Sequence, residues 1–84
     1  MLRYFFDVTH NQKLASDPTG HDLPGPDDAR LYAIGLLPDI ARAELPDGDH
    51  HEIVAEVRCP PDRIVYRARL TLEAGAVDEP ARTP

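Results

Sequence analysis

The chain has 84 residues, with 15 acidic and 9 basic side chains, a formal net charge of −6 and 42% hydrophobic residues. This length suits one small domain with a modest core. The negative charge argues against sequence-independent binding to nucleic acid or anionic lipid, because both need a cationic surface. The short apolar runs predict neither a signal peptide nor a membrane span, so we expect a cytoplasmic protein. The single cysteine excludes an intramolecular disulfide and a thiolate-only zinc site.

The first expected element is a strand over Arg3–Thr9, a segment rich in aromatic and β-branched residues. Alternation turns three of its side chains toward the core: Tyr4, Phe6 and Val8. The pair Asn11–Gln12 favours a turn, and Lys13–Ala15 follows as a short returning strand at an edge. The segment Ser16–Gly20 gathers residues typical of loops. The N-terminal part therefore predicts two strands, of which the second is short.

A helix is expected from Pro26 to about Leu45. Gly25 suits the N-cap, proline suits the first helical position, and Asp27–Asp28 lie at the positive end of the helix dipole. The segment Pro46–Gly48 should end the helix. At 3.6 residues per turn one apolar stripe forms and should lie on the sheet, with Leu37 at its margin: Ala29, Tyr32, Ala33, Leu36, Ile40 and Ala43.

Pro38 is the anomaly of this helix. It lacks the N–H that would bond the carbonyl of Ile34, at a cost of about 3 kcal/mol in a helix interior, so we expect a kink or a break. A second apolar stripe consists of Leu31, Ile34, Pro38 and Leu45, and it predicts an interface with another protein, most simply a second copy. The alternatives are that a kink at Pro38 turns both stripes into the core, or that these are scattered surface residues.

Two further strands are expected at Glu52–Arg58 and Arg63–Glu73, joined by the loop Cys59–Asp62 as a β-hairpin. Alternation turns eight of their side chains inward: Ile53, Ala55, Val57, Ile64, Tyr66, Ala68, Leu70 and Leu72. Residues 74–84 are small, charged or proline without a period, which is typical of a flexible C-terminal tail.

Together these elements predict a small α+β domain over residues 1–73, in the order β-β-α-β-β, with one helix packed on an antiparallel or mixed sheet. The positions that both periodicities turn inward should form one core. The expected core residues are Tyr4, Phe6, Val8, Ala33, Leu36, Ile40, Ile53, Val57, Tyr66, Ala68, Leu70 and Leu72.

Several motifs taken together resemble one family. They are Arg3–Val8, Asp17-x-x-Gly20-x-x-Leu23-Pro24, Ala29–Arg30 at the helix start, Glu44–Gly48, and Ala68–Glu73. This combination is similar to small bacterial proteins of unknown function that begin with an RYFFD or YFFDV strand. The resemblance covers nearly the whole chain from Leu2 to Glu73. It implies no activity, cofactor or catalytic residue.

Histidines and carboxylates gather in two clusters that could in principle bind a divalent metal. The first contains Asp7, His10, Asp17, His21 and Asp22, and the second is the run Asp47–Glu52. Neither has the alternate spacing of a calcium loop or the helical His-x-x-x-His arrangement. We therefore expect no metal and no cofactor, and interpret the clusters as solvated turns.

Enzymatic chemistry has weak support. Cys59 follows Arg58 in a loop that we expect to be exposed, where a thiolate could react, but no histidine is adjacent in sequence. Ser16 is the only serine and lies in no nucleophile-elbow motif. The favoured interpretation is that Cys59 is an incidental loop thiol and that the protein is not an enzyme.

The outward face of the sheet offers a different candidate site. It should carry Arg3, Phe5, Arg58, Arg67 and Arg69, a set that could bind a nucleic acid strand. However, carboxylates are expected on the same face, at Asp7, Glu52, Glu56 and Glu73, and opposite charges on neighbouring strands more often pair with each other. One aromatic residue is also too few for a stacking platform.

The sequence thus favours a non-enzymatic binding or assembly module that acts through protein–protein contacts, with a homodimer as the simplest form. The alternative is a regulatory or nucleic-acid-associated protein that uses the arginine-bearing sheet face.

Overall fold

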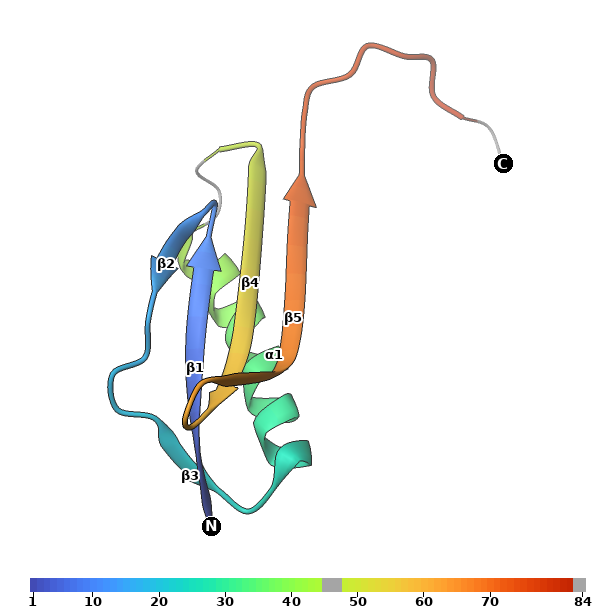
Figure 1. Cartoon of the computed structure of the whole chain (residues 1–84). Helices are drawn as coiled ribbons and strands as arrows, with labels where there is room; N and C mark the ends of the chain where they lie inside the picture. Colours follow the sequence, from blue (N-terminus) through green and yellow to red (C-terminus); the bar gives the residue numbers. More distant parts are fainter. Residues whose placement is uncertain (45–47, 83–84) are drawn as a thin grey trace.

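The computed structural model describes residues 1–44 and 48–82, which form a five-stranded antiparallel sheet with one helix packed on one face (Figure 1). The elements in chain order are β1 (Leu2–His10), β2 (Lys13–Ala15), β3 (His21–Leu23), α1 (Pro26–Glu44), β4 (His50–Cys59) and β5 (Arg63–Glu73). The predicted α+β class, the short second strand and the C-terminal hairpin are confirmed. Strand β3 is an addition that the sequence pattern did not predict.

The sheet has the order β2-β1-β4-β5, and β3 also pairs with β1. Strand β1 is therefore paired along both sides. On one side it meets β4, with Val8 opposite Ala55. On the other side its two halves meet different short strands, since Val8 lies opposite Ala15 of β2 and Tyr4 lies opposite His21 of β3.

Three residues with positive φ shape the path along this side. Asn11 and Gln12 have φ values of 49° and 72°, which is the left-handed conformation of a tight hairpin turn. Gly20 has φ 77°, and a Cβ there would lie 3.0 Å from the carbonyl oxygen of Tyr4. The predicted turn at Asn11–Gln12 is confirmed, and glycine is needed where the chain returns to β1.

Helix α1 begins at Pro26 as expected, and the Ala29 N–H donates to the Gly25 carbonyl at 3.3 Å. It runs without interruption through Pro38 to Glu44, so the expected break is not seen. Pro38 is exposed, so the carbonyl that it leaves unbonded can meet water. The expected last helical residue, Leu45, and the start of its stop signal, Pro46, lie outside the described residues.

The helix face that packs on the sheet differs from the predicted stripe. Ala29, Ala33 and Leu37 are buried, whereas Tyr32 and Ala43 are exposed. The buried residues recur every four positions, and the two alanines let the helix backbone approach the strands closely. The contact stripe therefore drifts around the helix relative to a 3.6-residue period, and the placement of Leu37 at the margin was wrong.

The core lies between α1 and the inner face of the sheet. Its buried strand residues are Tyr4, Phe6, Ile53, Ala55 and Val57, and the partly buried Val8, Leu36, Ile40, Tyr66 and Ala68 pack against them. The Phe6 ring contacts Tyr32 at 4.5 Å between centroids. Leu70 was expected in the core but is 40% exposed, because β5 is the last strand of the sheet and the helix leaves its outer half uncovered.

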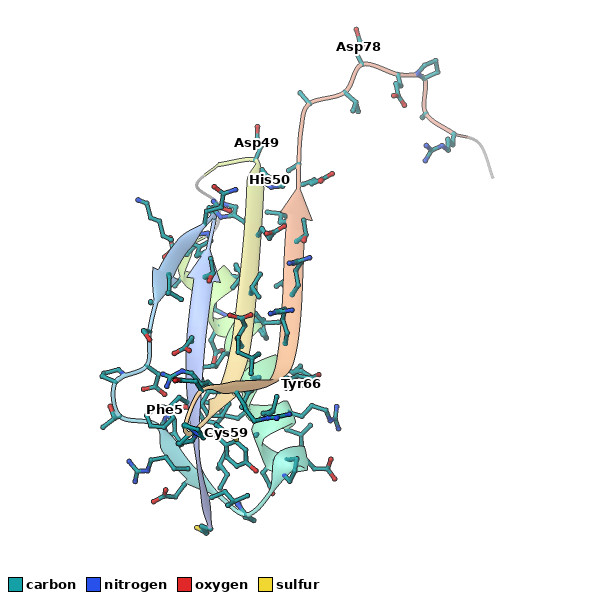
Figure 2. All side chains as sticks on the ribbon, viewed as in Figure 1. Phe5, Asp49, His50, Cys59, Tyr66 and Asp78 are labelled. Atoms are coloured by element: carbon teal, nitrogen blue, oxygen red, sulfur yellow. The ribbon has the colours of Figure 1, made fainter. Side chains whose placement is uncertain are left out.

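Residues 74–82 form neither helix nor strand and leave the sheet at the end of β5 (Figures 1 and 2). The Ala74 N–H donates to the Asp49 carbonyl at 2.7 Å, so the hairpin pairing ends there. The rest of the expected tail, residues 83–84, lies outside the described residues. Among the described residues no helix is long and apolar enough to span a membrane.

Replacing Phe6 by alanine should destabilise the domain by about 3–5 kcal/mol, because a large ring is removed from a core that cannot fully collapse around the cavity. Such a loss approaches the whole stability of a small domain. Urea unfolding followed by circular dichroism measures it, and Leu14→Ala at the exposed strand β2 is the control. Equal midpoints for Phe6→Ala and the wild type would contradict the assigned inward face of β1.

Candidate functional site

The two edges of the sheet differ sharply. One edge of β1 is covered by β2 and β3, each three residues long, whereas β5 forms the other edge over 11 residues and pairs only with β4. Within the part of the chain that the structure describes, no strand lies beyond β5 (Figure 1). One side of β5 therefore presents unpaired backbone N–H and carbonyl groups, the usual template for pairing with another chain.

The β1 edge is closed between β2 and β3 by the side chain of Asp17. The Phe6 N–H donates to one carboxylate oxygen of Asp17 at 3.1 Å, and the Thr19 and Gly20 N–H groups donate to the other at 3.1 Å each. The Asp17 N–H donates to Asp7 at 2.9 Å. Burial alone would raise the pKa of Asp17, but the N–H donors of Gly20, Phe6 and Thr19 outweigh it and hold this pKa below its usual value.

The outward face carries a second tightly bonded carboxylate, Asp7. Arg58 donates two hydrogen bonds to it, at 2.9 and 3.3 Å. This guanidinium, helped by the N–H of Asp17, lowers the pKa of Asp7 against the opposing effect of burial. The Arg58 guanidinium also lies 4.6 Å from the centroid of the Phe5 ring, a cation–π geometry. Arg58 thus links β4 to β1 and to the loop before β3.

The other arginines of the predicted outward-face site are also paired with carboxylates. Arg3 contacts Asp22 at 3.0 Å, Arg67 contacts Glu56 at 2.6 Å, and Arg69 lies 4.0 Å from Glu52. The structure therefore brings Arg3, Phe5, Arg58, Arg67 and Arg69 to one face, as expected. Because each guanidinium has an acidic partner, this face offers little net positive charge to a phosphate backbone.

Strand β5 contains a bulge that changes which residues face the helix. Tyr66 pairs with Val57 but Ile64 pairs with Arg58, so Val65 is an extra residue on this strand. Ile64 therefore shares the outward face with Arg58, and its expected inward position was wrong. Val65, which alternation placed outward, instead lines a pocket beside Tyr66 on the helix side. Both side chains stay about half exposed, at 52% for Ile64 and 49% for Val65.

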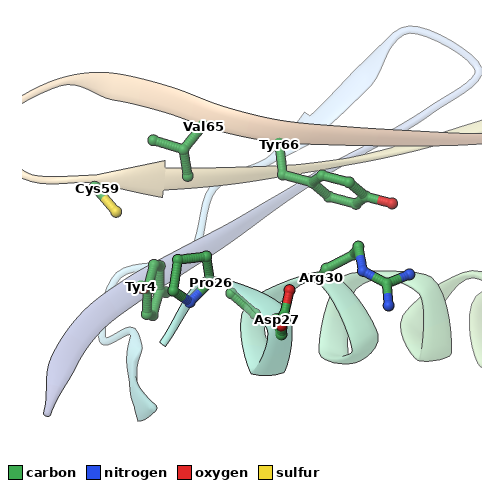
Figure 3. Close-up of a pocket in the computed structure, with 8 residues that line it drawn as sticks. Tyr4, Pro26, Asp27, Arg30, Cys59, Val65 and Tyr66 are labelled. Atoms are coloured by element: carbon green, nitrogen blue, oxygen red, sulfur yellow. The ribbon is translucent and has the colours of Figure 1, made fainter. Parts of the chain in front are cut away.

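An apolar pocket of about 250 Å³ opens between α1 and the bulged end of the hairpin (Figure 3). Tyr4, Pro26, Ala29 and Val65 form much of its wall, and Asp27 and Arg30 stand on the helix side. A smaller pocket of about 100 Å³ lies farther along β5, and its lining includes Leu70 and Leu72. Both linings include residues of β5, so side chains of a strand added there would have apolar recesses nearby.

Cys59 does not lie in an exposed loop as expected. It is the last residue of β4, it is half-buried, and its thiol points into the pocket between the strands and the helix (Figure 3). The pocket lining contains no histidine. Cys59 thus contributes to the wall of a mainly apolar pocket.

The two predicted histidine–carboxylate clusters are divided in the fold. His10 and His51 meet across β1 and β4, with 2.8 Å between Nε2 and Nδ1 and their rings stacked at 5.0 Å. His21 instead lies 3.2 Å from the hydroxyl of Tyr32, and Asp22 pairs with Arg3. Over residues 1–44 and 48–82 no three such side chains are placed to hold a metal ion. Asp47 lies outside these ranges.

The second helical stripe is found at the surface. Leu31 is 59% exposed, Ile34 and Pro38 are also exposed, and Leu45 lies outside the described residues. The stripe therefore stays a candidate interface. It is separate from the open edge of β5, which the sequence did not reveal because strand order depends on contacts distant in the chain.

The model of a family described as a domain of unknown function, DUF6894, matches residues 3–71, and the chain belongs to that family. No curated protein and no solved structure matches the chain. The expected resemblance to a family of unknown function is thus confirmed.

Removal of metal should leave the fold unchanged, because the described histidines and carboxylates do not converge on a common point: His10 contacts His51, His21 contacts Tyr32 and Asp7 pairs with Arg58. Thermal unfolding with and without EDTA tests this expectation. A clear decrease of the midpoint with EDTA would show that Asp7, His10, His50 or His51 binds a structural ion.

Acid should destabilise the domain through Asp7 and Asp17. Because their folded-state pKa values lie below the ordinary value of about 3.9, the unfolded chain takes up protons first as the pH falls. Their stabilising contribution is complete above about pH 5 and is lost progressively as the pH falls through about 3.9 and then through the lower folded-state pKa values. Urea midpoints measured across this range should fall less steeply for Asp7→Asn than for the wild type or for Asp78→Asn in the exposed tail. Parallel curves would contradict the role of Asp7.

Proposed function

We propose that the domain is a non-enzymatic protein-binding module that accepts an extended segment of another protein along the open edge of β5. The observation that carries this proposal is the contrast between the two sheet edges. The β1 edge is closed by two short strands and the Asp17 carboxylate, whereas β5 has a full-length unpaired side.

Strand addition suits this edge energetically. Each new backbone hydrogen bond contributes about 0.5–1.5 kcal/mol net, and alternate side chains of the added segment give specificity. Ile64, Val65 and Leu70 are all substantially exposed along β5. An added strand would cover part of this apolar surface and place its own side chains beside the two pockets.

The chemistry of the described residues supports a binding role over a catalytic one. Cys59 faces an apolar pocket, while His10 and His51 contact each other and His21 contacts Tyr32. The most strongly bonded carboxylates, Asp7 and Asp17, are engaged by Arg58 and by backbone N–H groups. Asp7 and Asp17 therefore stabilise the connections between strands. Asp17 and His21 also line a pocket of about 260 Å³, but there Asp17 is bonded to backbone N–H groups and His21 contacts the Tyr32 hydroxyl.

The alternative of nucleic-acid binding would use the arginine-bearing face. Salt dependence separates the two functions, because phosphate contacts weaken steeply with added salt whereas strand addition with apolar contact does not. Titration of a labelled single-stranded oligonucleotide at low and high salt measures it. Tight binding that collapses with salt would favour the alternative and overturn the proposal.

Selection from a library of short random peptides tests the proposal directly. We expect selected peptides to alternate apolar and polar residues and to lose at least about tenfold in affinity for Leu70→Lys, because an edge lysine opposes strand pairing. Leu14→Lys on the opposite edge is the matched control and should bind as the wild type does. Circular dichroism establishes that both variants fold.

Two results would overturn the β5 site. One is that the protein is monomeric under the conditions of selection and selects no peptide. The other is equal binding to Leu70→Lys with loss in Leu31→Glu, which would place the binding surface on the exposed stripe of α1.

A further inference from the structure

We infer that the strand accepted by β5 is β5 of a second copy, paired antiparallel across a two-fold axis beside Leu70. This inference rests on the proposed function and names the partner of the same edge. It joins the two sheets into one continuous sheet and pairs both long β5 edges at once, which leaves only the three-residue strands β2 and β3 at the far edge of each copy.

The symmetry limits the possible registers. An antiparallel pair of identical edge strands is related by a two-fold axis perpendicular to the sheet, which places both α1 helices on the same face. Side chains that lie directly opposite each other then share a face. An axis halfway between two successive residues would place those two residues opposite each other, although they lie on different faces. The axis must therefore pass between two copies of the same residue.

The bulge limits the registers further. Regular pairing of β5 with β4 runs from Tyr66 to Glu73, beyond the extra residue Val65. The middle of this stretch lies between Arg69 and Leu70. A pairing that uses most of the regular strand therefore has its axis at one of these two residues.

The cross-strand charge pairs favour the axis at Leu70 over the axis at Arg69. With the axis at Arg69, two guanidinium groups lie directly opposite each other, which destabilises a cross-strand pair. With the axis at Leu70, Arg67 lies opposite the second copy's Glu73, and this attractive pair occurs twice. Arg69 then lies opposite the second copy's Thr71. No like charges oppose each other over Arg67–Glu73.

The apolar face fits the same register. Leu70 lies on the helix side of β5 and is 40% exposed, and here it meets its own copy. Ala68 lies opposite the second copy's Leu72, so a small side chain faces a large one across the seam, the contact between the two β5 strands. The neighbouring pocket is lined by Leu70 and Leu72, and the seam would cover its open side. The edge is thus self-complementary on both faces.

Neighbouring registers fit less well. An axis at Ala68 places Arg67 opposite the second copy's Arg69. An axis at Thr71 keeps Arg69 opposite the second copy's Glu73, but it reduces the paired strand to Arg69–Glu73. The register at Leu70 is therefore the longest that avoids opposed arginines.

Charge exchange between two variants tests the register. We expect sedimentation velocity at micromolar concentration to show a wild-type dimer, with a dissociation constant raised roughly tenfold in Arg67→Glu and in Glu73→Arg, because each places two like-charge pairs in the seam. Mixing the two variants should restore the dimer, since both cross-strand pairs of the mixed dimer again join opposite charges. Arg42→Glu, exposed on α1, is the control and should not weaken association.

Crosslinking gives an independent measurement. With Cys59→Ala removing the native thiol, Leu70→Cys should form a disulfide-linked dimer on oxidation, because residues facing their own copies across a two-fold axis lie within disulfide reach. Arg67→Cys in the same background should crosslink poorly, since it faces position 73 and not itself.

Three results would overturn the inference: a monomeric wild type at high micromolar concentration, no recovery on mixing, or a dimer that only Leu31→Glu disrupts. A monomer that still binds selected peptides at β5 would overturn the self-pairing alone and leave the proposed function intact. A monomer that binds no peptide would overturn both.

Discussion

The Asp17 carboxylate is the interaction on which the arrangement of the sheet depends. Strand β1 has nine residues, and those of its backbone groups that point away from β4 need partners, for which the described residues supply two strands of three residues. Asp17 fills the gap between them by accepting the N–H of Phe6 and holding the loop through Thr19 and Gly20. A side chain thus replaces the missing stretch of strand, and the β1 edge is closed without a long additional element.

With the β1 edge covered, β5 is the long edge strand of the sheet. The helix packs mainly over β4 and less over β5, with Ala29 and Ala33 buried in the contact, and Leu70 of β5 stays 40% exposed. The bulge at Val65 adds to this effect, because it turns the start of β5 and opens a pocket toward Tyr4 and Pro26. Exposed apolar side chains of β5 therefore lie on the strand whose outer backbone groups are also unpaired among the described residues.

Features with a local signal could be predicted from the sequence. The alternation in β1, the turn at Asn11, the helix start at Pro26 and the C-terminal hairpin follow from neighbouring residues, and the structure has them all. Strand β3 was missed because three residues carry no pattern and pair only through β1. Ile64 was misplaced because a bulge leaves no local trace, and Leu37 because the helix crosses the strands at an angle that its own periodicity does not encode. The candidate site depends on strand order, so no local pattern could have identified it.

The arginines of β5 also affect whether this edge can aggregate at high protein concentration. A long edge strand with exposed isoleucine, valine and leucine is the kind of segment that stacks into parallel, in-register fibrils. In such a stack Arg63, Arg67 and Arg69 of each chain would lie directly above the same arginines of the next, at the spacing of about 4.8 Å that cross-β order imposes. The repulsion would accumulate with every added chain. Arg67 and Arg69, which pair with carboxylates inside the domain, would therefore act together with Arg63 as gatekeepers against unlimited growth of the sheet.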